Sequence, residues 1–123
     1  MDMGGSCLMA RSHKPIVWGL FAAGGTVAAF VLPVILILSG PAISFGLLPA
    51  DVLGYAHVRE LLQYPLSRLI TFGVLFLIIW HAAHRLRITM HDFGIRADTF
   101  VAVVFYSIAA MSTIVLMVAL IRL

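Results

Sequence analysis

Three long apolar stretches dominate the hydrophobic pattern of this chain, and the segments outside them carry all the charged residues except Arg68. The stretches cover approximately residues 16–38, 66–84 and 99–121. Crossing about 30 Å of hydrocarbon takes about 20 helical residues. A backbone in lipid must satisfy its own hydrogen bonds, so each stretch is predicted to be a transmembrane helix. The pattern therefore predicts an all-α chain in which residues 1–123 form a single three-span membrane domain.

Local signals refine the ends of these helices. Pro15 and Pro65 stand where the first and second helices begin, and proline is tolerated there because the N–H groups of a first turn have no helical partner. Asp98 precedes the third stretch and is predicted to be its N-cap.

The first loop, residues 39–64, is longer than a turn. Asp51 is predicted to cap a short helix in it, because apolar residues then recur at helical spacing at Tyr55, Val58, Leu61 and Leu62. We expect this short amphipathic segment to lie in the membrane interface.

A band of small residues, AAGGTVAA, occupies residues 22–29 of the first span. Small residues let transmembrane helices approach closely. Two interpretations stay open: packing within the chain, and packing against a different subunit.

Composition supports a membrane location. The chain is 63% hydrophobic and 11% charged, whereas soluble domains are about 45–50% apolar and about 25% charged. A water-soluble monomer and a disordered chain are therefore excluded. The net charge of +3 comes from scattered basic residues without a Lys/Arg-rich run, which argues against nucleic-acid binding. The single cysteine, Cys7, excludes an intrachain disulfide and a cysteine-cluster metal site.

Basic residues also predict the orientation. One side of the predicted membrane domain carries more of them than the other: Arg11, Lys14, Arg85, Arg87 and Arg96 against Arg59, Arg68 and Arg122. The positive-inside rule then places the N-terminus and the second loop in the cytoplasm.

Candidate chemistry gathers near the end of the second stretch. His81, His84 and Arg85 are spaced i, i+3 and i+4, so they share one helix face, and Trp18 lies at the same depth on the first helix. Such residues often only reach toward headgroups or complement a helix dipole. The alternative is a quinone site, in which Arg, Trp or His donors bind the quinone oxygens and a His handles protons near neutral pH.

A third interpretation concerns His81, because a His on a membrane helix can ligate haem b. A second axial ligand would then have to come from a partner chain. The carboxylates all fall in loops or caps, which argues against a proton-coupled transporter.

Two motifs connect the chain to a known family. KPIVWGLFAAGG, residues 14–25, followed by Pro33, resembles the start of the D subunit of fumarate reductase. HAAHR, residues 81–85, and the later His91-Asp92 pair resemble the same family. The resemblance covers nearly the whole chain from Lys14 onward.

The resemblance implies a hydrophobic anchor in the bacterial cytoplasmic membrane. In that family, two small membrane subunits, C and D, hold a flavoprotein and an iron–sulfur protein at the cytoplasmic face. Menaquinol is oxidised in the membrane, and its electrons pass through iron–sulfur clusters to FAD, where fumarate becomes succinate. The family's quinol-site residues match Trp18 and Arg85 here, with His84 alongside. The chain itself is then a non-catalytic subunit without flavin, cluster or metal.

The sequence also departs from the family pattern. Enterobacterial members have histidines where this chain has Arg87 and Ile88, and a cysteine where it has His81. They contain no haem, and we expect none here, with His81 hydrogen-bonded to a neighbouring carbonyl or hydroxyl in a packed interface. In haem-containing succinate dehydrogenase anchors, however, a ligand histidine occupies a similar position. Two alternatives therefore remain: a haem-b anchor of that type, and a non-redox accessory membrane protein.

Overall fold

The computed structural model describes residues 14–95 and 97–123. Cys7 and two of the basic residues used to predict orientation, Arg11 and Arg96, lie outside these described residues. Within them the chain is helical: α1 (Lys14–Ile37), the π-helical turn η1 (Leu38–Ala42), α2 (Tyr55–Leu61), α3 (Pro65–Asp92) and α4 (Asp98–Arg122). Three helical segments are long and apolar enough to cross a membrane, with mean hydropathies of 2.4, 1.8 and 2.3. The prediction of an all-α chain with three spans is confirmed.

The second helix is about two turns longer than the apolar stretch that predicted it. It runs through the polar segment after His84 to Asp92, because no glycine or proline interrupts that segment. It ends at Gly94, whose φ of +82° suits glycine. Gly94 N–H donates to His91 O, and Ile95 N–H donates to Met90 O, which is the Schellman pattern of helix termination.

Two predicted caps are wrong. Asp98 is the first residue of α4 instead of its N-cap, which is Ala97 and makes no side-chain capping bond. The Asp98 carboxylate binds an arginine of α3 instead. The short helix in the first loop is present as α2, but its N-cap is Gly54. The Asp51 backbone carbonyl accepts hydrogen bonds from Gly54 N–H and the His57 ring.

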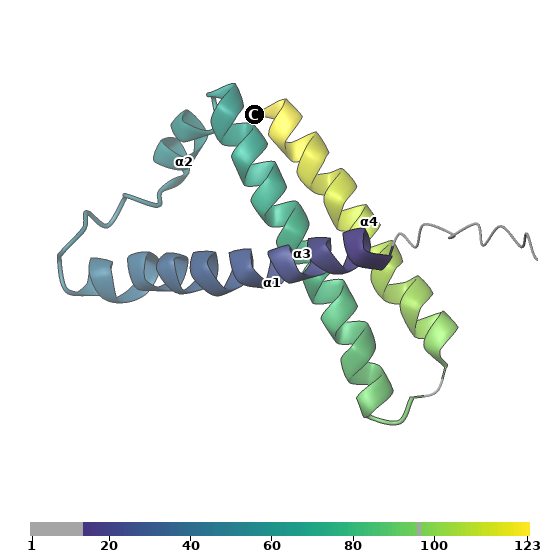
Figure 1. Ribbon diagram of the computed structural model, residues 1–123. Helices are drawn as coiled ribbons and strands as arrows, with labels where there is room; N and C mark the ends of the chain where they lie inside the picture. The colour runs from purple at the N-terminus through teal and green to yellow at the C-terminus, as the bar shows by residue number, and fades with distance from the viewer. Residues whose placement is uncertain (1–13, 96) are drawn as a thin grey trace, which may run out of the picture.

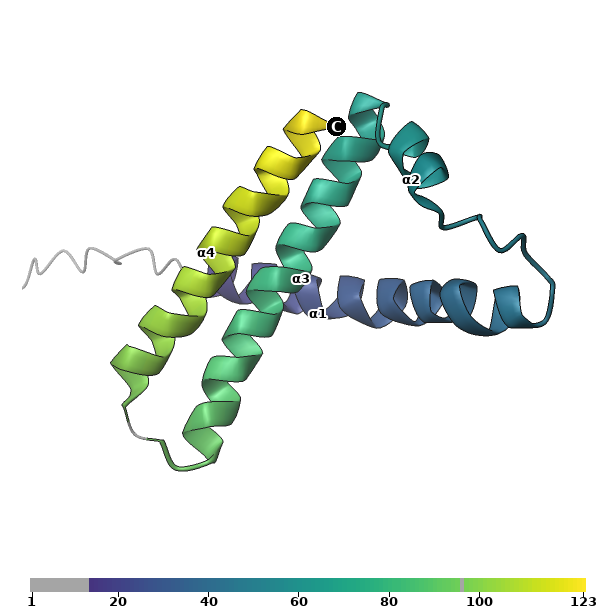
Figure 2. The ribbon, with the colours of Figure 1, turned by 180° about the vertical axis from the view of Figure 1, so that it is seen from behind.

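The central helix of the arrangement is α3, which packs against both α1 and α4. Helices α3 and α4 form an antiparallel hairpin, and α1 crosses α3 steeply instead of lying alongside it (Figures 1 and 2). The later half of α1 leads away from the hairpin, and the loop with α2 returns the chain to the start of α3 (Figure 1). Only the first half of α1 therefore meets α3.

Gly24 and Gly25 lie where α1 crosses α3. A Cβ atom built on Gly24 would lie 2.5 Å from the Leu77 carbonyl oxygen and 2.8 Å from His81 Cβ. One on Gly25 would lie 2.7 Å from His81 Cε1. These distances are too short for any side chain, so the α1 backbone itself packs on α3. The small-residue band is thus used within the chain at these two positions.

Most apolar surface is left open by this arrangement. Only 6%, 6% and 11% of the most apolar part of the three spans is buried within the chain. Large side chains such as Phe30, Phe100 and Ile121 are at least 70% exposed. Lipid or other subunits must therefore cover these faces.

We expect Gly24→Ala to destabilise the α1–α3 crossing, because its methyl group would meet the Leu77 carbonyl. Overpacking of this kind costs about 1–3 kcal/mol. The measurement is the thermal unfolding midpoint of the detergent-purified membrane complex.

Gly19→Ala is the matched control, since a Cβ there has no neighbour within 4 Å. Alanine favours a helix over glycine by about 1 kcal/mol, so this variant should be as stable as the parent or more so. Equal midpoints for the two variants would contradict the close crossing.

Candidate functional site

A cavity of about 230 Å³ lies between α1 and α3. Side chains from two helices line it: Trp18, Phe21 and Ala22 from α1, and His81, His84, Arg85 and Ile88 from α3. The four residues singled out from the sequence therefore meet around one cavity. Trp18 is 76% exposed and Arg85 is exposed, so both stand at its open rim.

His81 is held at the inner side of this cavity by the α1 backbone. Its Nδ1 lies 2.8 Å from the carbonyl oxygen of Phe21, and the ring nitrogen donates because a carbonyl can only accept. Gly25 lies against the ring corner between the two nitrogens. The ring is thus part of the packed contact between α1 and α3.

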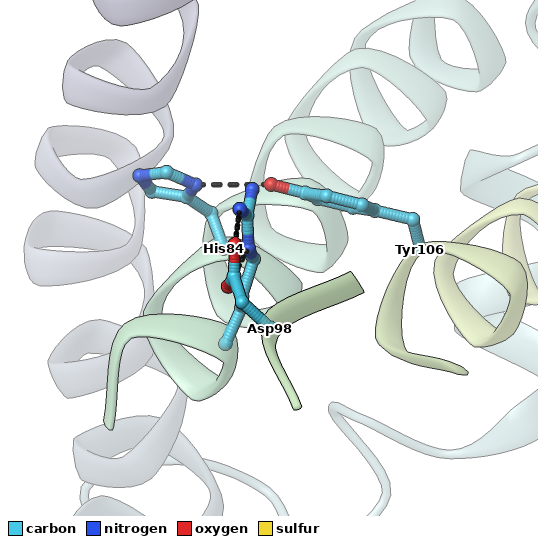
Figure 3. A network of polar contacts seen from close by, with 4 residues as sticks. His84, Asp98 and Tyr106 are labelled. Carbon is cyan, nitrogen blue, oxygen red and sulfur yellow. Dashed lines mark hydrogen bonds and ion pairs between the residues drawn. The ribbon is translucent and has the colours of Figure 1, made fainter. Parts of the chain in front are cut away.

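His84 lies between an aromatic ring and a hydroxyl. The Phe21 ring stacks on it from α1, with 4.1 Å between ring centroids and 12° between planes. Its Nδ1 lies 3.1 Å from the hydroxyl oxygen of Tyr106 on α4 (Figure 3). His84 is therefore oriented by both neighbouring helices.

An ion pair closes the other side of α3. Arg87 donates from Nε to Asp98 Oδ1 at 3.0 Å and from Nη2 to Asp98 Oδ2 at 2.6 Å. The guanidinium carbon also lies 5.9 Å from the centre of the Tyr106 ring, within the range of a cation–π contact. A second cavity, of about 320 Å³, is lined by His84, Arg87, Ile88, His91 and Asp98. His84 thus lines one cavity on each side of α3.

Tyr106 is fixed in place by aromatic packing deeper in the hairpin. Its ring stacks against Trp80, with 6.0 Å between centroids. Trp80 Nε1 donates to the Thr113 hydroxyl at 3.2 Å, and that hydroxyl donates to the Ala109 carbonyl at 2.8 Å. Every member of this chain of contacts comes from α3 or α4.

Sequence reasoning missed three residues of this site: Arg87, Asp98 and Tyr106. The sequence did contain an indication of the ion pair, because Arg87 and Asp98 carry opposite charges on either side of the turn at Gly94 between two long helices. Tyr106 also had one, since a hydroxyl inside an apolar span needs a hydrogen-bond partner. Neither signal names the partner, which depends on how α3 and α4 face each other.

No group of three or more His, Cys, Asp or Glu side chains that could hold a metal ion occurs within residues 14–95 and 97–123. Four of the polar side chains that line the cavities, His81, His84, Arg87 and Asp98, are paired with each other, with Tyr106 or with backbone.

Fold and site together define a multi-pass membrane protein whose exposed apolar helices must be covered by lipid or by other subunits. Residues 8–121 match the family described as the D subunit of fumarate reductase. The chain belongs to this family and is thus a membrane-anchor subunit of a multi-subunit fumarate reductase.

Curated relatives agree across distant bacteria. The fumarate reductase D subunit of Photobacterium profundum is 42% identical over 82 residues, 67% of this chain and 68% of the relative. The D subunit of Aliivibrio fischeri is 33% identical over 104 residues, covering 85% and 87%. The D subunit of Mycobacterium tuberculosis is 36% identical over 106 residues, covering 84% and 82%.

The Arg87–Asp98 pair should contribute little energy despite its bidentate geometry. Both side chains are partly exposed, at 32% and 47%, so solvent screens the attraction. A double-mutant cycle with Arg87→Gln and Asp98→Asn should give a small favourable coupling, measured from unfolding midpoints of the purified complex. Strictly additive single effects would show that the pair contributes nothing to joining α3 and α4.

Proposed function

We propose that this chain attaches the flavoprotein and iron–sulfur subunits of fumarate reductase to the bacterial cytoplasmic membrane, together with a second membrane subunit. We further propose that it contributes Trp18, His84 and Arg85 to a menaquinol oxidation site, with its N-terminus in the cytoplasm. One observation carries the proposal: these side chains converge from two helices on one cavity.

The residues at the cavity suit a quinol headgroup. The Arg85 guanidinium and the Trp18 indole N–H are hydrogen-bond donors for quinone oxygens, and the His84 imidazole can both donate and accept. Apolar side chains, Phe21 and Ile88, complete the wall against which a ring can pack. Oxidation of a quinol releases two protons and two electrons, and in this proposal the electrons pass to an iron–sulfur centre of a partner subunit and then to FAD.

The exposed apolar faces support the anchoring role. The three spans bury little surface within the chain, and a second hydrophobic subunit would supply the missing helix contacts. The long polar end of α3, together with the turn to α4, would offer a charged platform for water-soluble subunits.

The experiment that tests the site is Arg85→Ala. Losing a hydrogen bond from a charged group costs about 1.5–3 kcal/mol, or about 10- to 150-fold in quinol oxidation. Fumarate reduction by a soluble dye donor should be retained, because that reaction bypasses the membrane site. Both rates are measured on the purified complex.

Arg122→Ala serves as the control, since Arg122 is an exposed arginine at the opposite end of the hairpin. It should leave quinol oxidation near the parent rate. If Arg85→Ala reduces both activities equally, Arg85 maintains the assembly instead of the site.

We propose that His81 serves the close packing of α1 on α3 and does not ligate a haem. The Nδ1–H bond to Phe21 O would by itself leave Nε2 free as a ligand, but the ring lies so close to α1 that a Cβ atom on Gly25 would be only 2.7 Å from Cε1. We therefore predict a reduced-minus-oxidised absorption spectrum of the complex without a b-type haem band. A band that His81→Ala abolishes would instead establish the haem-containing alternative.

A further inference from the structure

We infer that Tyr106 is a positioning residue for quinol oxidation, which acts by fixing the ring orientation of His84. The inference rests on the proposed function, because it concerns how His84 meets a quinol in the cavity between α1 and α3. Tyr106 itself does not line that cavity.

The geometry fixes which ring nitrogen faces which side. The Nδ1 of His84 lies 3.1 Å from the Tyr106 hydroxyl oxygen. Figure 3 shows the other nitrogen, Nε2, on the edge of the ring that points away from Tyr106 and toward α1. The Phe21 ring stacked on His84 prevents the imidazole from tilting freely about this arrangement.

A hydroxyl at Nδ1 is compatible with a proton acceptor at Nε2, because it can accept a hydrogen bond from Nδ1–H. When Nδ1–H donates to the Tyr106 oxygen, the neutral imidazole carries its lone pair on Nε2. In the proposed step, one quinol O–H bond breaks and an Nε2–H bond forms, while one electron leaves for an iron–sulfur centre of a partner subunit. The second proton and the second electron leave in a second step of the same kind, after the imidazolium has passed its first proton to water. The imidazolium that results keeps its Nδ1–H bonded to Tyr106. The tyrosine hydroxyl thus serves both protonation states without moving.

The position of Tyr106 is itself well determined. Trp80 stacks against its ring, and Arg87, bonded to Asp98, lies over the same ring. These contacts hold the Tyr106 hydroxyl of α4 next to His84, which lines the cavity between α1 and α3. Helix α4 therefore takes part in the site without touching its ligand.

The test is Tyr106→Phe in the complete purified complex. The substitution removes the hydroxyl and keeps the ring that packs on Trp80. We expect kcat for quinol oxidation to fall about 2- to 13-fold, the range for loss of one hydrogen bond between neutral groups. The KM for quinol should change less than about twofold. Tyr106 does not line the cavity, and Trp18 and Arg85 still donate the hydrogen bonds that bind the headgroup. Dye-linked fumarate reduction should not change.

Tyr64→Phe is the matched control, since it removes the same hydroxyl from an exposed tyrosine at the opposite end of α3. Parent values of kcat in Tyr106→Phe would overturn the inference, and so would a rise in KM with kcat unchanged. If Arg85→Ala also oxidises quinol normally, the proposed site itself fails. If only Tyr106→Phe behaves normally, the site stands and the positioning role does not.

Discussion

The close contact between the Gly24 backbone and α3 is the constraint on which the rest of the site depends. A methyl group at this position would already collide with the Leu77 carbonyl. Phe21 lies one turn before Gly24 on the same face of α1, so the short separation brings its carbonyl to His81 and its ring onto His84. In lipid the hydrophobic effect does not drive helices together, so the van der Waals contacts that close backbone approach allows must hold α1 against α3. The same contact that joins α1 to α3 thus also shapes the cavity.

Two parallel rows of side chains run along α3 and serve different partners. Leu77, His81 and His84 meet α1, whereas Trp80 and Arg87 meet α4. The first row follows the spacing of four and three residues, and the two residues of the second row lie seven apart, or about two turns, so each row stays on one helix face. His84 stands at the border of the rows, and its ring contacts both neighbouring helices. Helix α3 therefore holds the hairpin together, and through His84 it also connects α1 to α4.

The apolar stretches alone were enough to predict three spans, because lipid leaves a backbone few other options. The grouping of Trp18, His84 and Arg85 was also within reach, since helix spacing and membrane depth restrict which side chains can meet. The ends of the helices were harder. Asp98 has the side chain of a good N-cap, but a nearby guanidinium offers two charge-assisted hydrogen bonds, and the ion pair forms instead. The steep crossing of α1 could not be predicted, because it depends on which faces of two apolar helices meet.

The length of α3 has a consequence for where a lipid-soluble substrate would react. Its 28 residues extend about 42 Å, more than the roughly 30 Å of hydrocarbon in a bilayer. Tilting absorbs part of such an excess, and the remainder must emerge into the headgroup layer. At the C-terminal end this excess amounts to at most about eight residues, which include Arg85, Arg87 and His91 of the two cavities, and His81 and His84 lie just below them. A quinol reaching them would keep its isoprenoid tail among the acyl chains while its ring rises into a region that water can enter. The C-terminal turns of α3 would thus set the membrane depth at which a quinol releases its protons to water.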